Sequence, residues 1–119
     1  MNSDKIAASY DPEDEVLADQ LKALAHPARL RIVEVLAARG TCICGQIVEV
    51  MPLAQATVSQ HLKVLKDAGL LQGTIEGPRS CYCLDMDALA SLRRVLDARL
   101  GRLESASCAA AKPETETVP

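Results

Sequence analysis

The sequence contains no phenylalanine and no tryptophan, and its only aromatic residues are two tyrosines. Apolar residues nevertheless make up 49% of the chain, so the core must be built from Leu, Val, Ile and Ala. Leu and Ala in particular favour helices. We therefore expect a mainly helical protein.

Long apolar runs are also missing. No stretch approaches the roughly 20 apolar residues of a membrane helix, and the polar start MNSDKIAASYDPEDE has no apolar signal-peptide core. We expect a cytoplasmic protein without a membrane partner. A length of 119 residues suits one domain, which we predict over residues 12–106, between flexible polar tails at 1–11 and 107–119.

Positive charge is scarce, which bears on nucleic-acid binding. The formal net charge is −3. Six carboxylates and one lysine give residues 1–20 a charge of −5, and the difference between −3 and −5 leaves +2 for the remaining chain. The body of the protein can therefore still meet phosphate groups, although its positive charge is modest.

Apolar periodicity predicts a series of helices in the first two thirds of the chain. A first helix carries Leu17, Leu21 and Leu24 and ends at His26, because Pro27 suits the first position of a second helix that runs to about residue 38. A brief strand is expected at 41–43, followed by helices at 46–50 and at about 54–68. The last two helices form a helix-turn-helix.

The remaining chain predicts a hairpin and a long helix. Strands at 70–74 and 80–84 are joined by a Gly-Pro turn at 75–79, which makes a wing. A leucine-rich stripe then marks the final helix: Met86, Leu89, Leu92, Leu96, Leu100 and Leu103. A stripe of this length needs a partner to cover it.

The segments LKALAHPARLRIVEVL and QATVSQHLKVLKDAGLL, with a Gly-Pro-Arg wing after them, resemble the ArsR/SmtB family of metal-responsive repressors over residues 15–104. The resemblance implies a mainly α fold with a small β-hairpin wing (α+β), a winged helix-turn-helix. It also implies a homodimer built on the first and last helices. Such a dimer binds double-stranded operator DNA, is not an enzyme, takes no small organic substrate and releases the operator when an inducer binds.

We expect the second helix of the helix-turn-helix to be the recognition helix, which contacts the DNA bases. A recognition helix meets base edges with its first turns, and Lys or Arg supplies phosphate contacts. His61 lies beside the buried stripe, so a structural histidine is as reasonable as a DNA contact, and Ala54 is a poor N-cap. The candidate DNA-binding residues are Gln55, Thr57, Ser59, Gln60, His61, Lys63 and Arg79.

Two Cys-x-Cys pairs carry the candidate chemistry, Cys42 with Cys44 and Cys81 with Cys83. Residues two apart in a strand share one face. The fold implied by the resemblance makes Cys42 a cross-strand neighbour of Cys81 or Cys83. Three or four thiolates suit trigonal As(III) or Sb(III), or tetrahedral Zn(II) or Cd(II).

The first pair departs from the metal box of the family, which reads like Cys-Val-Cys followed directly by Asp-Leu, because CICGQI carries an extra residue. The family's ligand set is therefore not carried over to this pair. Cys108, in SASCAAA, is a tail thiol or a further redox or ligand residue.

The leading hypothesis is a repressor that releases its operator when a thiophilic ion, above all As(III), binds these cysteines. A thiol redox switch, with Cys42 or Cys44 bonded to Cys81 or Cys83, is the alternative on the same fold. A thiol reductase is disfavoured because Cys-x-x-Cys and a phosphate-cradling loop are missing. A degenerate helix-turn-helix that binds no DNA is favoured only by the acidic pI, about 5.3.

Overall fold

The structure is a computed structural model that describes residues 10–40, 42–44, 53–75, 77 and 79–106. In chain order these residues form α2 (Pro12–Leu24), α3 (Pro27–Arg39), β1 (Ile43–Cys44), α4 (Gln55–Asp67), β2 (Leu71–Thr74), β3 (Cys81–Leu84) and α5 (Met86–Ser105). The predicted mainly α class with a small β wing is confirmed. The helix predicted at 46–50, Cys108 and most of both predicted tails lie outside the described residues.

The ends of the first two helices are set by local residues. The Asp11 carboxylate accepts a hydrogen bond from the backbone N–H of Glu13 at 2.9 Å and begins α2. Nδ1 of His26 accepts from the backbone N–H of Ala28 at 3.0 Å and begins α3. Gly40 ends α3 in the left-handed conformation, with φ of 71°, where glycine avoids the Cβ clash of other residues.

The three strands form one antiparallel sheet in the order β1-β3-β2. β1 pairs Ile43 with Tyr82 and Cys44 with Cys81. β2 pairs with the other side of β3, so these two strands form the predicted wing hairpin. The first strand was expected at 41–43 and lies at 43–44, because its bounds follow from the pairing with β3 rather than from a pattern of its own.

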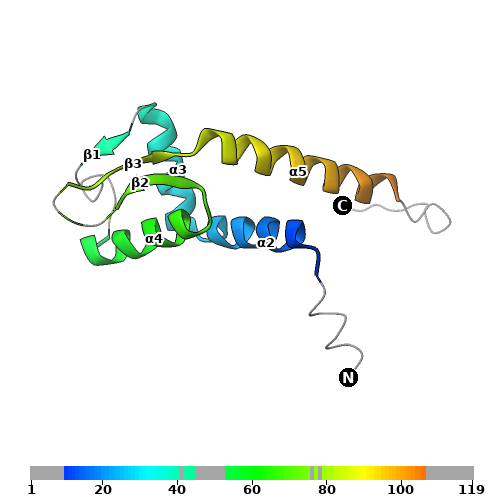
Figure 1. Cartoon of the computed structure of the whole chain (residues 1–119), viewed down its shortest axis with the longest axis horizontal. Coiled ribbons are helices and arrows are strands. Elements are labelled where there is room, and N and C mark those ends of the chain that lie inside the picture. Colours follow the sequence, from blue (N-terminus) through cyan, green and yellow to red (C-terminus); the bar gives the residue numbers. More distant parts are fainter. Residues whose placement is uncertain (1–9, 41, 45–52, 76, 78, 107–119) are drawn as a thin grey trace, which may run out of the picture.

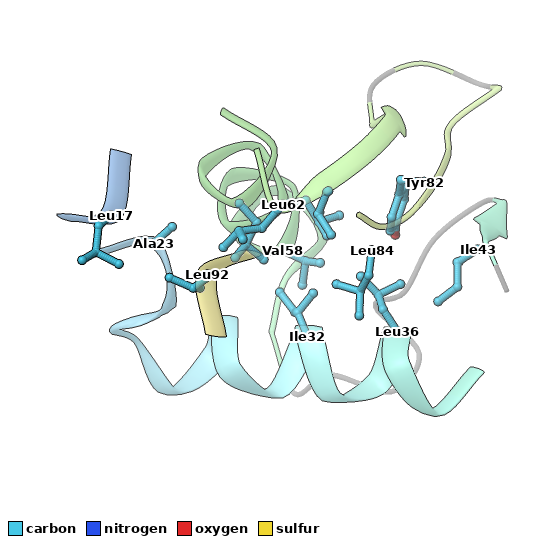
Figure 2. Packing of buried hydrophobic residues seen from close by; sticks show 13 residues of the cluster. Leu17, Ala23, Ile32, Leu36, Ile43, Val58, Leu62, Tyr82, Leu84 and Leu92 are labelled. Atoms are coloured by element: carbon cyan, nitrogen blue, oxygen red, sulfur yellow. The ribbon is translucent and has the colours of Figure 1, made fainter. Parts of the chain in front are cut away.

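Buried aliphatic side chains join the helices to the sheet, as Figure 2 shows. Ile32 of α3 and Leu65 of α4 have no exposed surface, and Tyr82 of β3 is 1% exposed. Val58 and Leu62 of α4 are buried as well. Helix α4 and the central strand β3 therefore share one core.

The long helix α5 leaves the sheet and runs out beside α2 (Figure 1). Nη2 of Arg99 lies 2.5 Å from Oδ1 of Asp14 and 3.8 Å from Oε1 of Glu13, which ties the two helices together. The far half of α5 keeps apolar surface in solvent, since Leu100 is 50% and Leu103 69% exposed. No helix among the described residues is long and apolar enough to cross a membrane.

Candidate DNA-binding helix and cysteine face

The side of α4 opposite the core carries the polar residues predicted to read DNA. Gln55, Gln60 and Lys63 are exposed, whereas Thr57 and Ser59 are half-buried. Nζ of Lys63 lies 3.6 Å from Oδ2 of Asp67. An exposed pair of this kind contributes little to stability, so Lys63 can exchange this carboxylate for a phosphate at small cost.

The start of α4 has no side-chain cap. Ala54 makes no side-chain hydrogen bond, and only its carbonyl oxygen enters the helix, by accepting from the N–H of Val58 at 3.0 Å. The first amides of α4 therefore lack a capping side chain, and such amides attract anions. Arg79, at the wing, is also exposed.

His61 differs from the other predicted contact residues because it packs against the junction of α2 and α3. Its ring centroid lies 4.5 Å from that of His26, and its Nδ1 lies 3.2 Å from Nη1 of Arg29. Burial lowers the pKa of His61, and the charges of His26 and Arg29 lower it further. These contacts favour the structural role over the DNA contact.

Arg29 is a residue that the sequence analysis missed. Its Nε donates to the carbonyl oxygen of Ala23 at 2.6 Å while its Nη1 meets His61. One guanidinium thus connects the last turn of α2 with α4. Helical periodicity carries no signal for this contact, because His61 lies 32 positions further along the chain.

A second link joins the recognition helix to the wing. Nζ of Lys66 in α4 donates to the carbonyl oxygen of Gly73 in β2. Gly73 has φ of 108°, and a Cβ there would lie 2.2 Å from the carbonyl oxygen of Cys81. The backbone of β2 therefore approaches β3 so closely that only glycine fits.

The sheet brings the two Cys-x-Cys pairs together on one face. Along β3, Tyr82 and Leu84 are buried and Cys81 and Cys83 are less so. In β1 Ile43 is buried while Cys44 is exposed. The apolar residue between each pair of cysteines, Ile43 or Tyr82, is thus buried in the core. We call the surface formed by Cys42, Cys44, Cys81 and Cys83 the cysteine face.

Within the cysteine face two sulfurs are bonded to each other and two are free. Cys44 and Cys81 are disulfide-bonded, with Cα atoms 3.9 Å apart, and Cys42 and Cys83 are free thiols. A side-chain hydrogen bond with Cys83 raises the pKa of Cys42, and burial and the charge of Cys83 add to the increase. In this bonded arrangement no group of three or more His, Cys, Asp or Glu side chains among the described residues can hold a metal ion.

Comparisons with known proteins agree with this geometry. A helix-turn-helix domain family matches residues 24–74. The HTH-type transcriptional regulator Rv2034 of Mycobacterium tuberculosis is 45% identical over 76 residues, which cover 64% of this chain and 70% of that protein. The arsenical resistance operon repressor of Bacillus subtilis is 38% identical over 74 residues, or 61% of this chain and 70% of the repressor.

The fold of this chain is also similar to that of a solved structure. The crystal structure of a possible transcriptional regulator for arsenical resistance is 32% identical, covers 75% of this chain and 96% of its own, and gives a TM-score of 0.55. These relatives are named as regulators and repressors, not as enzymes, so the thiol reductase alternative is rejected. The chain belongs to the ArsR/SmtB family of helix-turn-helix transcriptional regulators.

Proposed function

We propose that this regulator is a dimeric repressor that releases its operator when a thiophilic ion, above all As(III), binds the cysteine face. The observation that carries the proposal is that four sulfur-bearing residues lie close together at β1 and β3: Cys44 is bonded to Cys81 across the strands, and Cys42 and Cys83 line one cavity. Soft thiolates select As(III), Sb(III), Zn(II) or Cd(II) over ions that prefer carboxylates.

The donor set fits these ions once the bond between Cys44 and Cys81 is reduced. Four thiols then lie on one face, enough for three bonds to As(III) or Sb(III) or four to Zn(II) or Cd(II). The residues that would hold the ion are Cys42, Cys44, Cys81 and Cys83. The ion would supply a cross-link between β1 and β3 stronger than the backbone pairing of these short strands.

The packing offers a route from the cysteine face to the DNA-binding helix. Ile43 and Tyr82, on the reverse side of β1 and β3, are buried in the same cluster as Val58 and Leu62 of α4. Because packed interiors transmit displacement, a change in strand spacing reaches the recognition helix. Release requires only that the ion favour the DNA-free arrangement by a few kcal/mol.

DNA binding is assigned to α4 and the wing. The proposed contacts are the exposed or half-exposed Gln55, Thr57, Ser59, Gln60, Lys63 and Arg79, with His61 supporting the helix from behind. Gln60→Ala should change sequence preference at a cost of about 1–3 kcal/mol. Lys63→Ala should weaken binding to all sequences and reduce the salt slope by about one. Equal binding of both variants and the parent at every salt concentration would exclude α4 from the interface.

Dimerisation is assigned to the apolar side of α5. A groove of about 350 Å³ lies along it, lined by Leu89, Leu92, Arg93, Leu96, Asp97 and Leu100. Leu100→Asp should give monomers, because it places a charge in the proposed interface without touching the core. Ala98→Asp, at an exposed position of the same helix outside the groove lining, is the matched control. Sedimentation would refute the proposal if the parent is monomeric at micromolar concentration.

The sensing proposal is tested by operator release. Reduced protein bound to its operator is titrated with As(III), Sb(III), Cd(II) and Zn(II), for the parent and for each single Cys→Ser variant. Serine keeps the size and removes the soft ligand, so variants in either pair should retain DNA binding and show impaired release. Cys108→Ser is the control for an unrelated thiol. Normal release by Cys81→Ser and Cys83→Ser would refute a shared site.

A redox switch is the second candidate, and the bond between Cys44 and Cys81 favours it. In that case peroxide releases the operator, a dithiol reductant restores binding, and the ions have no effect on reduced protein. Release by peroxide alone would replace the ion-sensing proposal with this one.

A further inference from the structure

A cavity of about 340 Å³ lies beside the two free thiols. It opens where the end of α3, the start of β1, the end of β3 and the start of α5 meet. Its lining is mostly apolar, with the two thiols as the exception: Leu36, Ala37, Gly40, Cys42, Cys83, Leu84 and Met86. The volume is at the lower end of the range of small-molecule sites, which suits one compact apolar group.

The number of free thiols restricts what can bind there. With Cys44 and Cys81 bonded to each other, Cys42 and Cys83 are the free thiols among the described residues, and both line this cavity. Two thiols satisfy two of the three bonds of trivalent arsenic. Inorganic As(III) would keep a polar oxygen on the third bond, and the apolar lining offers it no charged partner. A carbon substituent on the third bond would instead lie against Leu36, Leu84 and Met86.

We infer that Cys42, Cys83 and the adjoining cavity form a binding site for monosubstituted organic arsenic(III), with arsenic on both sulfurs and the organic group in the cavity. The inference rests on the proposed thiol sensor and names a further ligand class for it. In the reaction R–As(OH)₂ exchanges two As–O bonds for two As–S bonds. Each thiol proton leaves with a hydroxide as water. Arsenic stays trivalent, so no oxidant or reductant is needed.

The test uses phenylarsine oxide and, separately, sodium arsenite on full-length Cys108→Ser protein purified without reductant, with the Cys44–Cys81 bond verified by peptide mapping. Intact-mass spectrometry gives stoichiometry, and displacement by 2,3-dimercaptopropanol gives relative affinity. We expect one phenylarsenic group per chain, with Cys42→Ser and Cys83→Ser each abolishing retention against a monothiol. Retention by either variant would overturn the site.

The cavity is tested by a pair of substitutions on α3. Ala37 lines the cavity, whereas Ala38 is exposed and does not. Ala37→Leu should weaken phenylarsenic binding about 10-fold by occupying the cavity, and Ala38→Leu should leave it unchanged. Equal affinities of the two variants would overturn the placement of the organic group. Because Ala37 is exposed, the variant should fold, which thermal unfolding followed by circular dichroism checks.

Two readouts separate this inference from the proposed function. Failure to bind phenylarsine oxide, with normal operator release by arsenite from reduced protein, would overturn the inference alone. Mass-detected binding at Cys42 and Cys83 without any effect of arsenicals on operator binding would uphold the site and refute the sensor.

Discussion

Replacing Gly73 with alanine should destabilise the wing more than any comparable glycine substitution. The new Cβ would lie 2.2 Å from the carbonyl oxygen of Cys81 and 2.9 Å from Cα of Tyr82. Both are backbone atoms, so no side-chain rotation relieves the overlap. A positive φ costs a residue other than glycine about 1–3 kcal/mol, and each ladder hydrogen bond lost as β2 moves away costs about 1 kcal/mol more. We expect a loss of about 2–5 kcal/mol.

Alanine substitutions at two other glycines separate the effect of the positive φ from the effect of the steric overlap. Gly77 also has a positive φ, 91°, but a Cβ there meets nothing within 4 Å. Gly77→Ala should therefore show the conformational cost alone, about 1–3 kcal/mol. Gly101 lies inside α5 with open space around it, and Gly101→Ala should stabilise the helix by about 0.5–1 kcal/mol.

The assay is urea unfolding followed by circular dichroism, at one protein concentration and one redox condition because dimerisation and the Cys44–Cys81 bond both affect stability. The free energy of unfolding should be highest for Gly101→Ala, lower for the parent, lower again for Gly77→Ala and lowest for Gly73→Ala. Equal losses for Gly73→Ala and Gly77→Ala would show that β2 and β3 do not approach as described.

Three further predictions concern buried or capping side chains. The hydroxyl of Tyr82 is buried without a hydrogen-bond partner among the described residues, and burial raises its pKa. Tyr82→Phe should therefore raise the free energy of unfolding in urea by about 1 kcal/mol. A lower free energy of unfolding would show that the hydroxyl has a partner. Because the pKa of His61 is lowered in the folded protein, the unfolded chain binds the proton first, and stability should fall as pH drops below about 6.5. His61→Gln should reduce that loss in unfolding measured from pH 7.5 to 5.5, and an unchanged profile would contradict the assignment. His26→Ala should lower the free energy of unfolding by about 1 kcal/mol because the α3 cap is lost, and His26→Asn should lower it less. Equal free energies of unfolding for the two variants and the parent would show that the cap contributes nothing.

Local sequence signals account for most of the fold. Helices α2, α3 and α4 follow from apolar spacing, and the ends of α3 follow from the short-range residues Pro27 and Gly40. The wing follows from two strand-length segments around a Gly-Pro turn. β1 begins two positions and ends one position later than expected, because so short a strand carries no periodic pattern and its bounds depend on Tyr82 and Cys81, far along the chain.

The features that the sequence did not reveal all depend on distant partners. The bridge from Ala23 through Arg29 to His61 joins three helices, and no spacing rule identifies it. The requirement for glycine at position 73 arises from the opposite strand. The cavity beside Cys42 likewise exists only because α3, β3 and α5 converge there.

The orientation of the cysteines, by contrast, follows from the residues between them. A shift of one residue in strand register would turn the cysteines inward and expose Ile43 and Tyr82. Exposing these two side chains, which are 6% and 1% exposed, would cost about 1.5–3 kcal/mol each. The apolar residues thus favour this register independently of the bond between Cys44 and Cys81. A Cys→Ser variant should therefore keep the strand pairing and lose only thiol chemistry, so its failure to respond can be attributed to the missing sulfur.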